Sequence, residues 1–149
     1  LGLSTIDLGR TPHIADSLVM PDLMQTETRS HGFNSVVDEG GSGLFGLPTM
    51  YRSKYEASEE EIPSDVQFYH GDTDLQISAL GELSGENDAR NDYTCEVSCI
   101  DWYGNARPIF IHDRIFALTG SELIEGRRDA HSITEIGRIR ITGDPVRQH

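Results

Sequence analysis

The chain has 149 residues, of which 25 are acidic and 12 are basic, and its formal net charge is -13. This length allows a substantial core within one domain. The charge excludes nucleic acid as an expected partner, because phosphate binding requires a basic patch and the sequence contains none. No apolar run reaches the length of a membrane helix. The chain begins with Leu1 rather than Met, and we expect it to be the end of a longer protein.

Lys54 is the one lysine, and arginine supplies the other basic side chains. An acidic surface poor in lysine suits high ionic strength, because carboxylates stay hydrated while salt screens their mutual repulsion. The alternative interpretation is an ordinary acidic protein from a high-GC genome. Composition leaves both interpretations open.

Short apolar segments separated by polar turns follow one another along the chain, and no segment has a sustained helical period. Residues 21–30 are polar and are expected to be irregular, and residues 52–64 and 85–92 are expected to be loops. The fold class is therefore all-β. We expect strands at 1–8, 13–20, 33–38, 44–51, 66–69, 74–83, 95–103, 109–111, 115–118, 123–125 and 133–141.

The segment from Arg107 to Gly120 is the most informative part of the sequence. Two apolar runs, Ile109 to Ile111 and Ile115 to Leu118, flank a polar triplet at 112–114, which predicts a β-hairpin with a tight loop. Both runs are apolar at successive positions, so we expect the hairpin to be buried on both faces between neighbouring sheets.

An internal repeat supports this arrangement of stacked sheets. Residues 76–83 (QISALGEL) match 132–139 (SITEIGRI) and, more loosely, 11–18 (TPHIADSL). In addition, 44–48 (LFGLP) echoes 115–119 (IFALT). Each unit predicts two hairpins that form one four-stranded blade of a β-propeller. The chain then contains the closing strands of one blade at 1–20 and two further blades at 31–84 and 94–142, which is an incomplete ring.

Several short motifs carry a resemblance to a known family. They are LGLSTIDLGRTP at the start, SHGF and GLFGLP around His31, Phe33, Leu44, Leu47 and Pro48, and IHDRIFALT near the end. In these motifs the chain resembles secreted proteins with a C-terminal β-propeller domain distantly related to WD repeats. The resemblance implies an extracellular or cell-surface protein, and it implies no established reaction.

Three groups of residues are candidate sites. His31 stands at the start of a predicted strand, where it could face a central channel, although a structural role is the alternative. Trp102 and Tyr103 could form an aromatic platform for a sugar or peptide, or could be buried between blades. Asp72 and Asp74 suggest a calcium loop, but no glutamate follows at the EF-hand offset, so a plain turn is the alternative.

Catalytic motifs are absent from the sequence: it has no G-x-S-x-G elbow and no phosphate-binding glycine loop. None of the six histidines has a close metal-ligand spacing. Cys95 and Cys99 lie four residues apart in a predicted strand, about 13 Å at roughly 3.3 Å per residue. That separation is too long for a disulfide, so we expect two free thiols.

The expected function is a non-catalytic extracytoplasmic binding or scaffold module. Its expected partners are the remaining propeller blades or another protein, and calcium is the one cofactor that the sequence suggests. The alternative is part of a propeller hydrolase or other enzyme whose active site lies in blades outside this chain.

The acidic composition generates the first testable prediction. If the surface is adapted to salt, the melting temperature should rise steeply between low and molar NaCl, because screening removes repulsion among the carboxylates. Thermal unfolding at increasing NaCl measures this. A flat response would favour the ordinary acidic interpretation.

Overall fold

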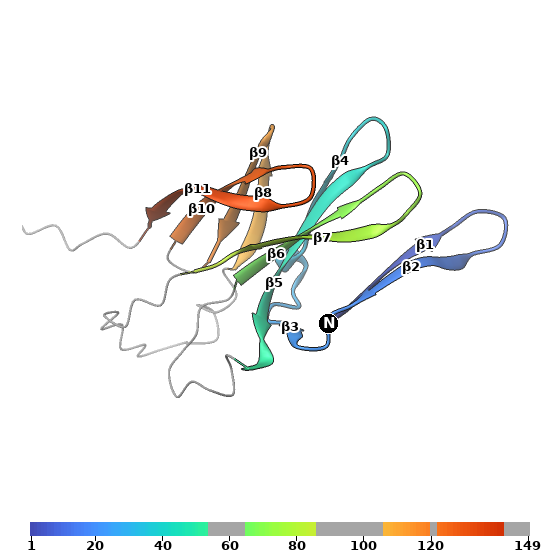
Figure 1. The fold of residues 1–149 in the computed structure, drawn as a ribbon, viewed down its shortest axis with the longest axis horizontal. Helices are drawn as coiled ribbons and strands as arrows, with labels where there is room; N and C mark the ends of the chain where they lie inside the picture. The colour runs from blue at the N-terminus through green and yellow to red at the C-terminus, as the bar shows by residue number, and fades with distance from the viewer. Residues whose placement is uncertain (54–64, 86–105, 120–121, 142–149) are drawn as a thin grey trace, which may run out of the picture.

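The computed structural model describes residues 1–53, 65–85, 106–119 and 122–141. Within these residues the fold is all-β and every strand pair is antiparallel, which confirms the expected fold class. The strands form three sheets, none of which closes into a barrel (Figure 1). The predicted strand 95–103, and with it Cys95 and Cys99, lies outside the described residues.

The elements in chain order are β1 (Gly2–Asp7), β2 (His13–Val19), β3 (Leu23–Gln25), the 3-10 turn η1 (Ser30–Gly32), β4 (Asn34–Val37), β5 (Gly43–Tyr51), β6 (Asp65–Gly71), β7 (Ile77–Leu83), β8 (Arg107–Ile111), β9 (Arg114–Leu118), β10 (Glu122–Arg128) and β11 (Ile133–Arg140).

The three sheets differ in their number of strands. Strands β1 and β2 form a two-stranded hairpin, and β8, β9, β10 and β11 form a four-stranded sheet in chain order. In the middle sheet, β5, β6 and β7 also follow chain order, while β4 and β3 pair with successive parts of β5. The expectation that residues 21–30 are irregular is wrong at β3, because Leu23 is buried and pairs with Tyr51.

The predicted hairpin at 107–120 is confirmed, with a loop of two residues. His112 has φ 52 in this loop, and Arg114 already belongs to β9. The two-residue length suits a tight reversal that needs a positive φ. Burial on both faces holds for β9 at Ile115 to Ala117 but is wrong at the end of β8, where Ile111 is 51% exposed.

The internal repeat has a structural signature. In the hairpins β1–β2, β6–β7 and β10–β11, the pairing register shifts once, and the second strand of each hairpin carries one extra residue. That residue is Ala15, Leu80 or Ile136, each of which is fifth in its aligned segment (11–18, 76–83 and 132–139). The same bulge at the same repeat position confirms this alignment of the three segments.

The match between residues 44–48 and 115–119 is out of register by one residue. Phe68 and Glu125 are equivalent in the repeat, and they pair with Gly46 and Phe116 respectively. Gly46, rather than Phe45, therefore corresponds to Phe116. A shift of one residue moves a side chain to the opposite face of a sheet, so the two phenylalanines of the echo face in opposite directions.

The middle sheet and the β8–β11 sheet pack face to face. Phe68 and Phe110 meet edge to face, with ring centroids 6.1 Å apart. At the edges, equivalent strands lie beside one another, β4 next to β8 and β7 next to β11, while β8 also lies next to β5, and β2 lies next to β7. The three sheets consequently spread as a fan (Figure 1). The buried core between the two larger sheets comprises Val66, Phe68, Leu80, Leu83, Ile115, Ala117, Ile124 and Ile133.

Gly46 sets how closely these sheets approach. A Cβ at this position would lie 2.8 Å from the Cβ of Pro108 and 3.1 Å from Cδ1 of Phe68. We expect Gly46→Ala to lower the free energy of unfolding by about 1–3 kcal/mol through overpacking. Urea unfolding measures the change. Gly71→Ala is the matched control, because a Cβ there meets no heavy atom within 4 Å, and an equal loss in both variants would contradict this account.

Candidate functional site

His31 lies in η1 beside a buried carboxylate. Glu27 is 5% exposed, and it accepts hydrogen bonds from the backbone N and the guanidinium of Arg29 at 2.8–3.1 Å. The Nε2 atom of His31 lies 3.5 Å from Oε2 of the same carboxylate. The hydrogen bonds from the Arg29 side chain lower the pKa of Glu27 to about 2, although burial opposes the shift.

Glu27 also shapes the turn that carries His31. A Cβ at Gly32 would lie 2.7 Å from the Cγ of Glu27, so the turn rests directly on this side chain. Gln25 donates to the backbone oxygen of Glu27 at 2.6 Å, which ties the turn to the end of β3. The buried carboxylate of Glu27, paired with the half-exposed Arg29, thus supports the turn that carries His31, whose side chain is 38% exposed.

An aromatic row begins two residues after His31. Phe33 and Phe45 have ring centroids 5.9 Å apart, and Phe45 stacks on Tyr69 at 5.2 Å. Tyr69 is buried and its hydroxyl donates to the sulfur of Met20, and burial raises its pKa. The outer end of the row, Phe33, is 52% exposed. His31 and Phe33 together present an imidazole and a ring face to solvent.

Asp72 organises the turn between β6 and β7. Its Oδ1 accepts from the backbone N of Asp74 at 2.9 Å and of Gln76 at 2.8 Å, and Leu75 in this turn has φ 63. An Asp side chain that accepts from the following amides is typical of a turn. No group of three or more metal-ligating side chains occurs among the described residues. Calcium binding at Asp72 and Asp74 stays a prediction.

Trp102 and Tyr103 lie outside the described residues, so their role as an aromatic platform or as buried contacts stays a prediction.

A serine-histidine contact was not identified from the sequence. The Oγ of Ser42, in the turn after β4, lies 2.8 Å from Nε2 of His70 on β6. The two residues are 28 positions apart, and their contact depends on the pairing of β5 with β6. A nucleophilic serine also needs an acid on the other imidazole nitrogen, and no carboxylate is hydrogen-bonded there among the residues that the structure describes.

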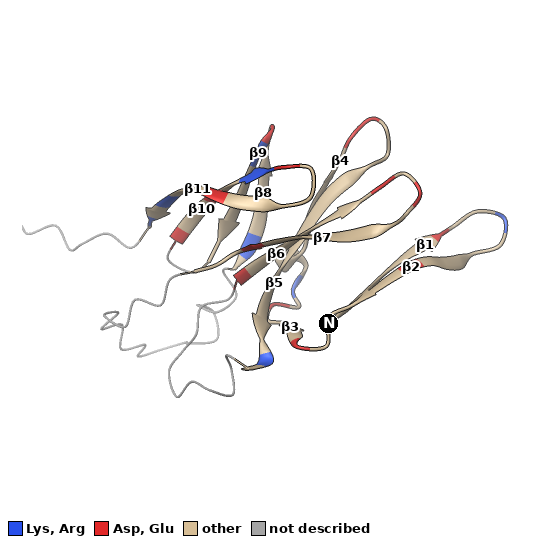
Figure 2. Cartoon of the chain, viewed as in Figure 1, with Lys and Arg blue, Asp and Glu red and all other residues tan. Residues whose placement is uncertain are grey.

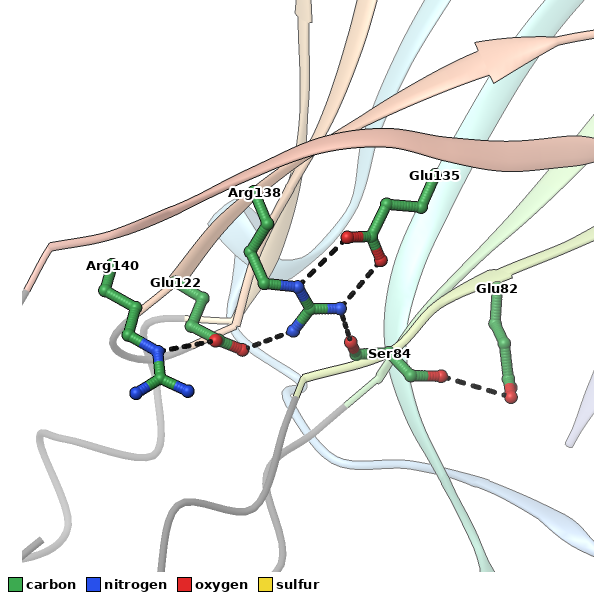
Figure 3. A network of polar contacts seen from close by, with 6 residues as sticks. All are labelled: Glu82, Ser84, Glu122, Glu135, Arg138 and Arg140. Carbon is green, nitrogen blue, oxygen red and sulfur yellow. Dashed lines mark hydrogen bonds and ion pairs between the residues drawn. The ribbon is translucent and has the colours of Figure 1, made fainter. Parts of the chain in front are cut away.

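A second buried ion-pair network joins the two larger sheets (Figure 3). Arg138 on β11 donates to Glu122 on β10 at 2.7 Å and to Glu135 at 2.7 Å. The Nη2 atom of Arg138 also donates at 2.9 Å to the backbone oxygen of Ser84, just after β7. Arg140 lies 3.6 Å from Glu122, which is buried. Arg138, Arg140, Glu122 and Glu135 each lie beside an opposite charge, as the buried Glu122 requires, so we assign the network to the packing of the sheets.

The turns carry a further part of the charge. Figure 2 shows acidic positions in the turns after β4 and β6. The described residues contain no helix that is long and apolar enough to cross a membrane. Comparison of the chain with models of known families, with curated proteins and with solved structures finds no match.

The low pKa of Glu27 predicts a loss of stability in acid. In the unfolded chain this carboxyl has its ordinary value near 4.5, whereas in the fold it is about 2. Unfolding therefore takes up a proton between these values, and the stabilisation by Glu27 falls as pH drops from about 4.5 to 2. Glu27→Gln should lower the melting temperature at pH 7 and flatten its decline in acid.

Thermal unfolding between pH 2 and 7 measures both effects. Glu39→Gln, in the exposed turn after β4, is the control and should keep the wild-type profile. A Glu27→Gln profile parallel to that of the wild type would contradict the assignment.

Proposed function

We propose that the chain is a non-catalytic binding or scaffold module in which sheets stack as the blades of a β-propeller. Its partners would be further blades or another protein, and its location would be extracellular or at the cell surface, as the family resemblance implies. The module acts by presenting surfaces that other protein segments cover or bind.

One observation carries this proposal: equivalent strands of successive units lie side by side. Strands β4 and β8, each the first strand of its unit, lie side by side. Strand β7, the last of its unit, lies between β2 and β11, the last strands of the other two units. In a propeller the sheets repeat radially about one axis, so each strand lies beside its equivalent in the next blade. The equivalence holds for these outer strands, whereas β8 also lies next to β5, and β9 next to β6.

The hairpin β1–β2 supports a role in assembly. Strands β6 and β10, which are equivalent to β1, each pair with a second strand on their other side, β5 or β9. Within the described residues β1 pairs with β2 alone. An unpaired strand edge is a template for another strand, so a partner that supplied the two missing strands would complete a four-stranded unit.

His31 and Phe33 are the proposed ligand-binding surface. Phe33 offers an exposed ring face, and His31 offers an imidazole held by Glu27. An aromatic face beside a polar group suits a sugar ring or a peptide side chain.

A hydrolase is the second candidate, and the contact between Ser42 and His70 is the observation that favours it. If His70 activated Ser42, the hydroxyl would attack an ester or amide carbonyl while the imidazole accepted its proton. A test of this candidate is whether Ser42 is reactive, since among the described residues the contact joins a serine and a histidine.

Two measurements test the proposed function. In an experimental structure of the protein with its partner segments, a strand should pair with β1 and the sheets should surround one axis. Sheets that instead close on themselves as a two-layer sandwich would overturn the propeller arrangement.

The second measurement is labelling with a fluorophosphonate, which reacts with activated serines. We expect no label on the wild type. Label that is lost in both Ser42→Ala and His70→Gln would favour the hydrolase over the non-catalytic module. Ser35→Ala, on exposed β4, is the matched control.

A further inference from the structure

The β8–β11 sheet has an apolar face turned away from the middle sheet. We call it the outer sheet face. Leu118 pairs with Leu123, and Leu123 pairs with Ile139, so the three side chains lie on the same face. Ile139 is 65% exposed and Ile111 is 51% exposed. The face comprises Ile109, Ile111, Leu118, Leu123 and Ile139, together with the exposed ion pair between Arg114 and Glu125, whose arginine lies over the buried ring of Phe116.

The internal repeat shows what this face lacks. In each of the hairpins β1–β2, β6–β7 and β10–β11, two apolar side chains lie directly opposite each other at the same repeat position. In the middle sheet the pair is buried, with Val66 0% and Leu83 2% exposed, because the β8–β11 sheet covers it. The equivalent pair in the β8–β11 sheet lies on the outer sheet face, where Ile139 is exposed. The three pairs are Leu3 with Leu18, Val66 with Leu83, and Leu123 with Ile139.

The hairpin β1–β2 carries the complementary surface. Thr5 faces the middle sheet, since its Oγ1 donates at 2.5 Å to the backbone oxygen of Leu75 in the turn between β6 and β7. Ile6, the next residue along β1, therefore points to the opposite side, where it pairs with Ile14. We call this side the outer hairpin face. Ile6 is 56%, Ile14 is 63% and Val19 is 71% exposed.

Within the chain, each unit is covered by the same face of the unit that follows it. The β8–β11 sheet covers the middle sheet with the face that is equivalent to the outer hairpin face. Among the described residues, the hairpin is the unit whose face of this kind is exposed. The hairpin and the β8–β11 sheet lie at opposite ends of the fan (Figure 1), so their outer faces cannot meet within one molecule.

We propose that the outer sheet face of one copy of this chain docks on the outer hairpin face of a second copy. The contact is heterologous, because two different surfaces meet, and it repeats the packing of successive units within the chain. The inference rests on the repeat and on exposed apolar side chains, and it concerns this chain when no further blade or partner of the proposed function covers these faces.

Charge makes the association depend on salt. Each copy carries a net charge of -13, so copies repel one another at low ionic strength. Molar salt screens this repulsion and strengthens the burial of apolar surface. The head-to-tail complex should therefore form more tightly at high salt, the opposite of an association held by ion pairs.

Sedimentation of the 149-residue chain over a range of concentrations tests the proposal. The wild type should exceed its monomer mass of 16.5 kDa as concentration rises, and more strongly in molar NaCl. Ile139→Lys and Ile6→Lys should each weaken association at least tenfold. His131→Lys adds the same charge in the exposed turn before β11 and should behave as the wild type.

A mixing experiment distinguishes this contact from a symmetric one. Ile139→Lys keeps an intact hairpin face, and Ile6→Lys keeps an intact sheet face. An equal mixture should therefore form a one-to-one dimer that grows no further, whereas a symmetric interface would give no recovery. Circular dichroism checks folding, and Ile139→Ser and Ile6→Ser replace any lysine variant that unfolds.

A wild type that is monomeric at every concentration and salt level, or a mixture without a dimer, would overturn the proposal. Either result would leave the proposed function standing, because that function fails on a different observation, the arrangement of sheets around one axis.

Discussion

The apolar pair of Val66 on β6 and Leu83 on β7 is the contact on which the arrangement of the sheets depends. Where Val66 and Leu83 lie opposite each other, the β8–β11 sheet seals them from water. The favourable free energy of this burial scales with the apolar area removed from solvent. A bulge beyond the pair twists each hairpin in the same way, so each sheet offers the next a similar surface.

The polar groups of the molecule are arranged around this apolar packing. Arg138 links Glu122 to the backbone just after β7, so an ion-pair network spans the seam between the sheets (Figure 3). The buried Glu27 pairs with the half-exposed Arg29, and the two residues hold the turn that carries His31. Removing one partner of such a pair leaves an uncompensated buried charge, which costs more than the pair itself contributes.

The middle sheet packs one face against the β8–β11 sheet and contacts the hairpin β1–β2 on its other side. Its turns and strand ends are therefore the parts that are open to a ligand. His31 and Phe33 lie at such a strand end, and Ser42 lies in a turn. The large apolar faces at the two ends of the fan are better suited to protein segments than to small molecules.

The sequence by itself determined the all-β class, the central hairpin and the repeat of the fourth strand. Each follows from local pattern, because apolar runs, turn residues and a recurring segment are visible along the chain. It singled out His31 as a candidate, which stays a prediction, and it did not indicate the carboxylate of Glu27 beside it.

Only the tertiary structure decided which faces are buried and which residues meet. The echo between 44–48 and 115–119 misled by one residue, because similar letters do not fix the register of pairing. Ile111 looked buried from its apolar neighbours, yet exposure depends on whether another sheet covers it. The contact of Ser42 with His70 and the bridge from Arg138 to Ser84 join residues far apart in the chain, and pairing and packing alone bring them together.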